Sequence, residues 1–379
     1  MINLTKQQRL RQLSDAQYQQ FKKAIAHIDL LLPKLGNMDY RLFNIEDDYN
    51  QSRPQSDRKE RSRLCEDPDL IAQDFLDALA SINVIIDHYP LDELPLYLSI
   101  LVESLDAWDL WGFPYHKTHF DQNEVQQLNS AVRFIQRRLC DRDIMLEIKR
   151  IEILEVRQAK SIQQYIDSLI NAFAKLQVIR IDFHYQKDLP ICYSEVHQHR
   201  ERLIRYLREK HMGHAHVGHI WKLEYGLRRG YHLHMFIFMD GSKVQQNILH
   251  AKKICEQWND VIAQGKGTSY NCNAKQGQYK HNGIGKVEYF DENKINALHS
   301  WASNYLLKYD PYIEIMQQAE ARALLEEDNV ALAMQIANGR VFGKGQLPNI
   351  RIRRGRPRSL NRDDERILKT ILLDQQKES

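Results

Sequence analysis

The spacing of apolar residues predicts helices throughout the first 165 residues. Apolar side chains there recur three and four positions apart, as in the cluster over residues 24–35. Further helices are expected over residues 71–88, 91–106 and 123–140. The stretch 46–67 is polar and charge-dense, which favours a loop or linker. We therefore expect residues 1–165 to form an all-helical N-terminal domain, whose role the pattern does not indicate.

The pattern changes near residue 176, where β-branched and aromatic residues become frequent. Strands are predicted over residues 177–185, 217–225, 231–239 and 284–289, and helices over 194–210, 243–263 and 293–309. The second and third strands are close enough to form a hairpin. This mixture predicts an α+β domain, built around an antiparallel sheet, over residues 166–350.

Composition narrows the class of protein. The chain has 379 residues, 43% of them hydrophobic, and no run approaches the roughly 20 apolar residues of a membrane span. The first residues lack the apolar core of a signal peptide, so a cytoplasmic protein without a membrane partner is expected. The five cysteines include no C-x-x-C pair, which argues against a disulfide framework or a cysteine zinc site.

Charge is informative only locally, because the net charge is +3. Residues 339–358 hold seven Arg or Lys and no Asp or Glu, an excess that would attract a phosphate backbone. Residues 351–379 are therefore expected to form a basic C-terminal tail, with Arg353, Arg354, Arg356 and Arg358 as candidate DNA contacts. Arg354-Gly-Arg-Pro357 resembles the core of an AT-hook, although a generic basic tail explains the same residues.

The strongest chemical signal is His232-Leu233-His234 within a predicted strand. Side chains two apart on a strand share a face, so both imidazoles project together as candidate metal ligands. Two histidines packed in a core are the plainer interpretation. The other pair, His214-Ala-His216, is expected before its strand, facing solvent or DNA rather than a metal.

The hairpin register predicts a third ligand. A three-residue loop over 228–230, with Gly230 left-handed, pairs Leu227 with Tyr231 and sets Glu224 opposite His234. A two- or four-residue loop would place Glu224 on the other face. The resulting Glu/His/His set suits a divalent ion, with Mg²⁺ or Mn²⁺ preferred and Zn²⁺ not excluded.

Several other residues are candidates around that set. Asp182 and His184 alternate on one face of the first strand, where either could support a ligand or act as a base. Arg228 and Arg229 lie at the hairpin tip, which suits phosphate contact as well as an ordinary solvated turn.

A second constellation lies further along, at Tyr305, Lys308 and Tyr309. On one helix, Tyr305 and Tyr309 are four apart and Lys308 is three from Tyr305, so their polar ends can meet. A free tyrosine has a pKa of about 10 and is a poor nucleophile, so a metal that polarises a phosphodiester would have to activate the reaction. Packing of an amphipathic helix on the sheet is the plainer alternative.

Together these motifs resemble the HUH endonucleases, in particular rolling-circle replication initiators of the filamentous-phage (inovirus) type and their prophage relatives. The resemblance rests on His232-Leu233-His234, on Tyr305-x-x-Lys308 after it, and on the strand 178–185, and it covers roughly residues 170–350. Gly283-Ile-Gly285 and Gly339–Gly343 flank the tyrosine segment as they do in that group.

The resemblance implies a central five-stranded antiparallel sheet flanked by helices, with its metal face open to single-stranded origin DNA. Tyr305 would attack a phosphate, leaving a free 3′-OH and a 5′-phosphotyrosine link, and the strand would later be rejoined. Tyr309 would serve as a second nucleophile if both tyrosines act. A host helicase and the replication machinery are the implied protein partners.

Two other functions remain open on the sequence. A catalytically silent, prophage-derived DNA-binding regulator would keep the fold, although the histidines, the carboxylate and the tyrosine are all present. A metal-dependent hydrolase of small substrates would have no need of Tyr305 and Lys308. An adduct assay with Mn²⁺ would discriminate among the three.

Overall fold

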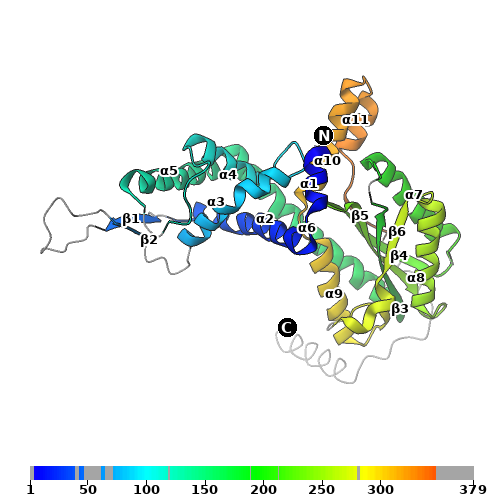
Figure 1. Ribbon diagram of the computed structural model, residues 1–379. Helices are drawn as coiled ribbons and strands as arrows, with labels where there is room; N and C mark the ends of the chain where they lie inside the picture. The colour runs from blue at the N-terminus through cyan, green and yellow to red at the C-terminus, as the bar shows by residue number, and fades with distance from the viewer. Residues whose placement is uncertain are drawn as a thin grey trace, which may run out of the picture.

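The protein is an α+β molecule, with helices packed on an antiparallel sheet (Figure 1). A computed structural model describes residues 4–38, 42–46, 61–64, 71–117, 120–187, 189–211, 213–279 and 282–346. Within these ranges, no helix combines the length and the apolar character needed to cross a bilayer.

The N-terminal part is built mainly from helices that bury apolar stripes against one another. They are α1 (Leu4–Gln12), α2 (Asp15–Gly36), α3 (Ile71–His88), α4 (Leu96–Ala107) and α5 (Gln122–Leu139). Figure 1 shows them extending to one side of the sheet. Helix α2 begins with a capping box, in which the Ser14 hydroxyl accepts a hydrogen bond from the backbone N–H of Gln17.

The expectation of an all-helical part is wrong in one place. Strand β1 (Phe43–Glu46) pairs antiparallel with β2 (Arg61–Leu64). The side-chain amide of Asn129 on α5 hydrogen-bonds both the N–H and the carbonyl of Phe43, at 3.3 and 2.8 Å. The strand Phe-Asn-Ile-Glu alternates apolar and polar residues, but four residues give only a short signal. A tertiary contact from a distant helix adds to its stability.

Helix α6 (Arg142–Ala172) runs without a break through the expected boundary at residue 165. Ile144 in the first turn of α6 lies in the same core as the N-terminal helices. The last turns of α6 pack on the sheet instead. The residues buried there are Ile162, Tyr165, Ile166, Leu169 and Ile170. One helix therefore connects the two parts across the expected boundary.

The sheet has six strands, all paired antiparallel. They are β3 (Lys175–Tyr185), β4 (His216–Gly226), β5 (Gly230–Asp240), β6 (Gly267–Asn271), β7 (Gly285–Glu288) and β8 (Phe342–Lys344). The order is β6-β3-β5-β4-β8, and β7 pairs with the other end of β3. The sheet has one strand more than the five expected. Because β6 and β7 divide one edge between them, it is nevertheless five positions wide.

The two faces of the sheet are covered differently. One face carries Leu233, Met235 and Ile237 and lies under α7 (Tyr193–Glu209) and α8 (Asn247–Gln257). On the other face, Phe236 and Phe238 pack against α6 and α9 (Glu292–Leu306). His232 and His234 share this second face but are only partly buried. The candidate site therefore lies where the apolar cover of that face ends.

Gly283 sets how closely α9 approaches the sheet. A Cβ at this position would lie 2.4 Å from both the Cα and the N of Leu298, which are backbone atoms of α9. Gly283→Ala is therefore expected to push α9 outward and lower the free energy of unfolding by about 1–3 kcal/mol. Urea denaturation would measure this change. Gly277→Ala, where a Cβ meets nothing within 4 Å, is the matched control and should have a much smaller effect.

Candidate metal centre

The hairpin between β4 and β5 presents the candidate ligands. Its loop is Leu227–Arg229, with Gly226 paired to Gly230, and the Arg229 N–H donates to the Gly226 carbonyl at 3.0 Å. Gly230 has φ +74°, the left-handed conformation expected for it. The predicted register is wrong by two residues, because Glu224 lies opposite His232 rather than His234. A shift of two keeps every side chain on its face, so Glu224 still shares the face of both histidines.

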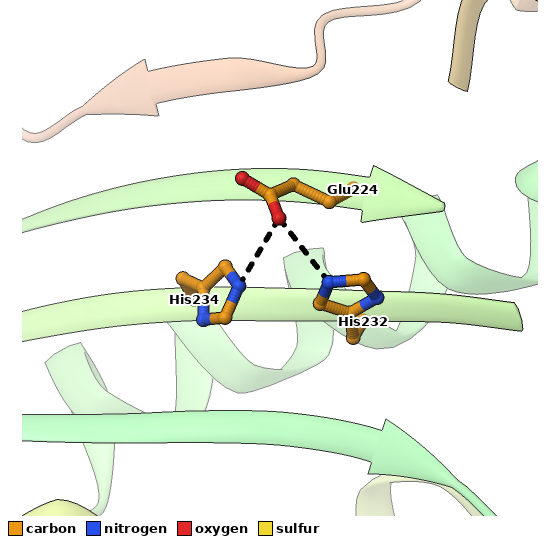
Figure 2. A group of neighbouring side chains, drawn as sticks. All are labelled: Glu224, His232 and His234. Atoms are coloured by element: carbon orange, nitrogen blue, oxygen red, sulfur yellow. Dashed lines mark hydrogen bonds and ion pairs between the residues drawn. The ribbon is translucent and has the colours of Figure 1, made fainter. Parts of the chain in front are cut away.

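Glu224, His232 and His234 converge on one point (Figure 2). The Glu224 Oε2 lies 3.2 Å from His232 Nε2 and 3.3 Å from His234 Nε2. The three candidate ligand atoms all lie within 4.8 Å of one another, and they form the one such group found in the described residues. One carboxylate oxygen and two imidazole nitrogens, partly exposed, fit a divalent cation with open coordination positions.

The charges around this group favour a cation. Burial opposes the ionisation of Glu224, but hydrogen bonds from His232 and His234 outweigh it and hold the Glu224 pKa well below its usual range. Burial alone would lower the pKa of His234, yet the Asp182 and Glu224 carboxylates raise it to about 9. The two carboxylates thus create a local demand for positive charge, which a metal ion would satisfy.

Asp182 and Arg180 hold the ring of His234 in its orientation. Its Nδ1 lies 2.7 Å from Asp182 Oδ1, which leaves Nε2 directed at Glu224. The buried Arg180 forms an ion pair with Asp182 at 3.2 Å, and its guanidinium lies 5.2 Å from the ring of Trp301 on α9. Asp182 was a sequence candidate, whereas Arg180 was missed. Its signal was its position two residues before Asp182, on the same face of the strand.

Asp182→Asn should weaken metal binding without removing a ligand. An amide cannot hold the His234 ring with the strength of a carboxylate, so the affinity for Mn²⁺ is expected to fall by about 10- to 100-fold. Isothermal titration calorimetry would measure it. Asp260→Asn makes the same chemical change at an exposed position on another element and should bind Mn²⁺ normally. Equal affinities for wild type and Asp182→Asn would contradict the role given to Asp182.

His184 is the other candidate on β3, and its side chain lies on the same face of the sheet as the metal ligands. It lies opposite His232 in the β3–β5 register, and the two rings stack with centroids 5.7 Å apart. Burial and the neighbouring His232 lower the pKa of His184 to about 4. A neutral ring at this position can accept or donate one hydrogen bond without adding charge to the site.

Two further groups near the triad were not anticipated. Lys222 Nζ lies 3.3 Å from Glu224 Oε1 and also donates to the backbone carbonyl of Lys308. Asp310 accepts from the Tyr225 N–H at 2.7 Å and caps α10 (Pro311–Glu326). Burial, with the charge of Glu224, raises the pKa of Asp310 to about 6. An Asp-Pro pair is a helix-start signal that could have located this cap.

The tyrosine segment departs from the single helix that was predicted. Helix α9 ends at Leu306, so Tyr305, Lys308 and Tyr309 do not share a helical face. Pro311 keeps Asp310 out of helical backbone and begins α10. The segment before it is held to β4, by Lys222 at the Lys308 carbonyl and by Asp310 at the Tyr225 N–H. Tyr305 lies in the last turn of α9, but its side chain is outside the described part of the chain.

Tyr309 and Lys308 are directed elsewhere. The Tyr309 hydroxyl donates to Glu314 Oε2 at 3.0 Å, and its N–H donates to Glu155 Oε1 at 3.1 Å. Burial, with the nearby Glu314 carboxylate, raises the pKa of Tyr309 above its usual value. The side chain of Lys308 is exposed. Neither side chain takes part in the contacts that assemble the Glu/His/His group.

The two hairpin arginines differ. Arg228 pairs with Asp15 of α2 at 2.8 Å and lies 5.1 Å from the ring of Tyr18, so a phosphate would have to compete for it. Arg229 is exposed and lines a pocket beside the triad. Four other candidate contacts lie outside the described residues, namely Arg353, Arg354, Arg356 and Arg358.

The other His-x-His pair stays apart from this centre. His214 is exposed in a turn. The expectation is wrong for His216, which begins β4 and stacks its ring on that of His219 at 5.5 Å. Neither joins a group of three candidate ligands among the described residues.

Comparison of this chain with protein-family models, with curated proteins and with solved structures finds no match.

Proposed function

We propose that this protein is a metal-dependent DNA-nicking and strand-transfer endonuclease of the HUH type, acting as a rolling-circle replication initiator. The observation that carries the proposal is the convergence of Glu224, His232 and His234 on one sheet face, where the apolar cover ends. The resemblance noted in the sequence supplies the reaction. Single-stranded origin DNA is the proposed substrate, and Tyr305 is the proposed nucleophile.

Glu224, His232 and His234 would hold a Mg²⁺ or Mn²⁺ ion, which when bound draws charge from the oxygens of the scissile phosphate. Asp182 keeps the His234 ring oriented, and Lys222 places a positive charge beside Glu224. The Tyr305 hydroxyl loses its proton as its oxygen bonds to phosphorus. The bond from phosphorus to the 3′ oxygen breaks, and that oxygen takes up a proton.

This exchange conserves one phosphodiester bond, so it is reversible and allows the strand to be rejoined. Attack by the released 3′-OH on the phosphotyrosine would restore the DNA and free Tyr305. A hydrolase that uses water would lose that option. The proposal therefore accounts for a Tyr-x-x-Lys motif after the His-x-His pair, which a simple hydrolase does not require.

A covalent adduct is the test. The protein is incubated with Mn²⁺ and a pool of random single-stranded oligonucleotides labelled at the 3′ end, the end that stays attached through a 5′-phosphotyrosine. We expect a labelled band that survives denaturing electrophoresis and disappears when EDTA is present from the start. Retention of DNA binding without any adduct, in either Mn²⁺ or Mg²⁺, would instead support a catalytically silent regulator on the same fold.

A further inference from the structure

The pocket beside the metal centre extends away from the triad, across β3 to the edge strand β6. Besides the two histidines and Asp182, it is lined by His184 and Arg229 and by three consecutive residues of β6, Thr268–Tyr270. The triad does not use the β6 side of this pocket. Its chemistry is different from that of the metal centre, since it offers a hydroxyl, an aromatic ring and a guanidinium.

Tyr270 lies level with the metal ligands on the same face of the sheet. In the antiparallel register it pairs with Asp182, which pairs in turn with His234. Directly opposed residues share a face, so the three side chains form one row across β6, β3 and β5. Two strand spacings, about 9–10 Å, separate the backbones of Tyr270 and His234. Tyr270 is thus about one nucleotide's reach from the proposed phosphate position.

The side chain of Tyr270 is exposed to solvent, unlike most tyrosines of this sheet. Its residue is 44% exposed, whereas the tyrosines on the opposite face of the sheet, such as Tyr185, Tyr225 and Tyr231, are buried. An exposed aromatic ring on an edge strand contributes little to the core, but it offers a flat surface to a ligand. Arg229 lines the same pocket from the hairpin tip and supplies positive charge.

We propose that this pocket holds one unpaired nucleotide next to the scissile phosphate, with its base stacked on Tyr270 and a backbone phosphate near Arg229. The inference rests on the proposed function for the identity of the ligand, a single strand of DNA. Stacking uses the π-face that every base has, so this subsite positions the strand without reading its sequence. An aromatic platform beside a cation is the combination that single-strand binding requires.

The test separates the contribution of the bases from that of the phosphates. Two fluorescent probes of about twelve residues are compared in Mn²⁺, an oligothymidylate and its fully abasic counterpart with the same charge. Tyr270→Ala is expected to weaken binding of the oligothymidylate about 10-fold while leaving the abasic probe unchanged. Tyr270→Phe keeps the ring and should bind like wild type. Photo-crosslinking with 5-iodouracil in the oligothymidylate should modify the peptide that contains Tyr270.

A matched control excludes a general effect of losing an exposed ring. Phe290→Ala removes a ring that is 65% exposed, just beyond β7 at the other end of the same sheet edge, and should leave both affinities unchanged. Equal weakening of both probes by Tyr270→Ala, or no weakening of either, would overturn the subsite. If wild type forms the adduct but Tyr270→Ala binds normally, the subsite alone fails. If base-selective binding is lost with Tyr270 but no adduct ever forms, the subsite stands and the nicking reaction fails.

Discussion

Replacing His234 with alanine is expected to reduce the yield of covalent DNA adduct by about 100-fold or more, while DNA binding is retained. The change removes one of the three convergent donors, and it also removes the group that separates Glu224 from Asp182. Both effects should abolish tight binding of Mn²⁺. Adduct formation measures the activity, titration calorimetry measures the metal, and oligothymidylate binding reports whether the strand still docks.

His214→Ala is the matched control for this variant. It deletes the exposed imidazole of the other His-x-His pair, which lies outside the Glu/His/His group. Its adduct yield and Mn²⁺ affinity should equal those of wild type. If His234→Ala formed adduct at the normal rate, the metal centre could not be the site of the reaction, whatever the two histidines do for the fold.

The candidate ligands could be found in the sequence because a strand repeats every two residues. Any three-residue loop in this hairpin pairs residues whose numbers sum to an even number. Glu224 therefore lies on the same face as His232 and His234 in each such register. An error of two residues therefore changed the partner of Glu224 without changing its face. Alternation on β3 flagged Asp182 for the same reason. The apolar cover that ends beside these residues follows from Phe236 and Phe238 continuing the same face.

The features that sequence reasoning missed depend on contacts between distant segments. Strand β1 is held by Asn129, 86 residues away from Phe43. The stretch 46–67 was expected to be a loop or linker, yet it contains β2, the partner of β1. Tyr270 lies in a five-residue edge strand whose register is set by pairing with β3, far away in the sequence. The start of α10 was the exception, because Asp310-Pro311 could have been recognised as the beginning of a new helix.

Tyr305→Phe is expected to abolish the covalent adduct, by about 1,000-fold or more, because phenylalanine has no oxygen to bond to phosphorus. Tyr309→Phe should retain most of the activity. The Tyr309 hydroxyl already donates to Glu314, and Arg150 binds the same Glu314 carboxylate at 2.8 Å. Burial beside that carboxylate raises the pKa of Tyr309, which makes its phenolate still harder to form. Adduct yield on the 3′-labelled oligonucleotides, with metal binding as the control for folding, measures both variants.

The reverse result would place the nucleophile differently. An adduct that survives in Tyr305→Phe but not in Tyr309→Phe would require Tyr309 to leave Glu314 and turn toward the triad. The backbone between α9 and α10 opposes that movement, because it is held to β4 by Lys222 at the Lys308 carbonyl and by Asp310 at the Tyr225 N–H. Loss of the adduct in both variants would mean that the first cut needs both hydroxyl groups. In that case Tyr309 must exchange its bond to Glu314 for the DNA before that cut.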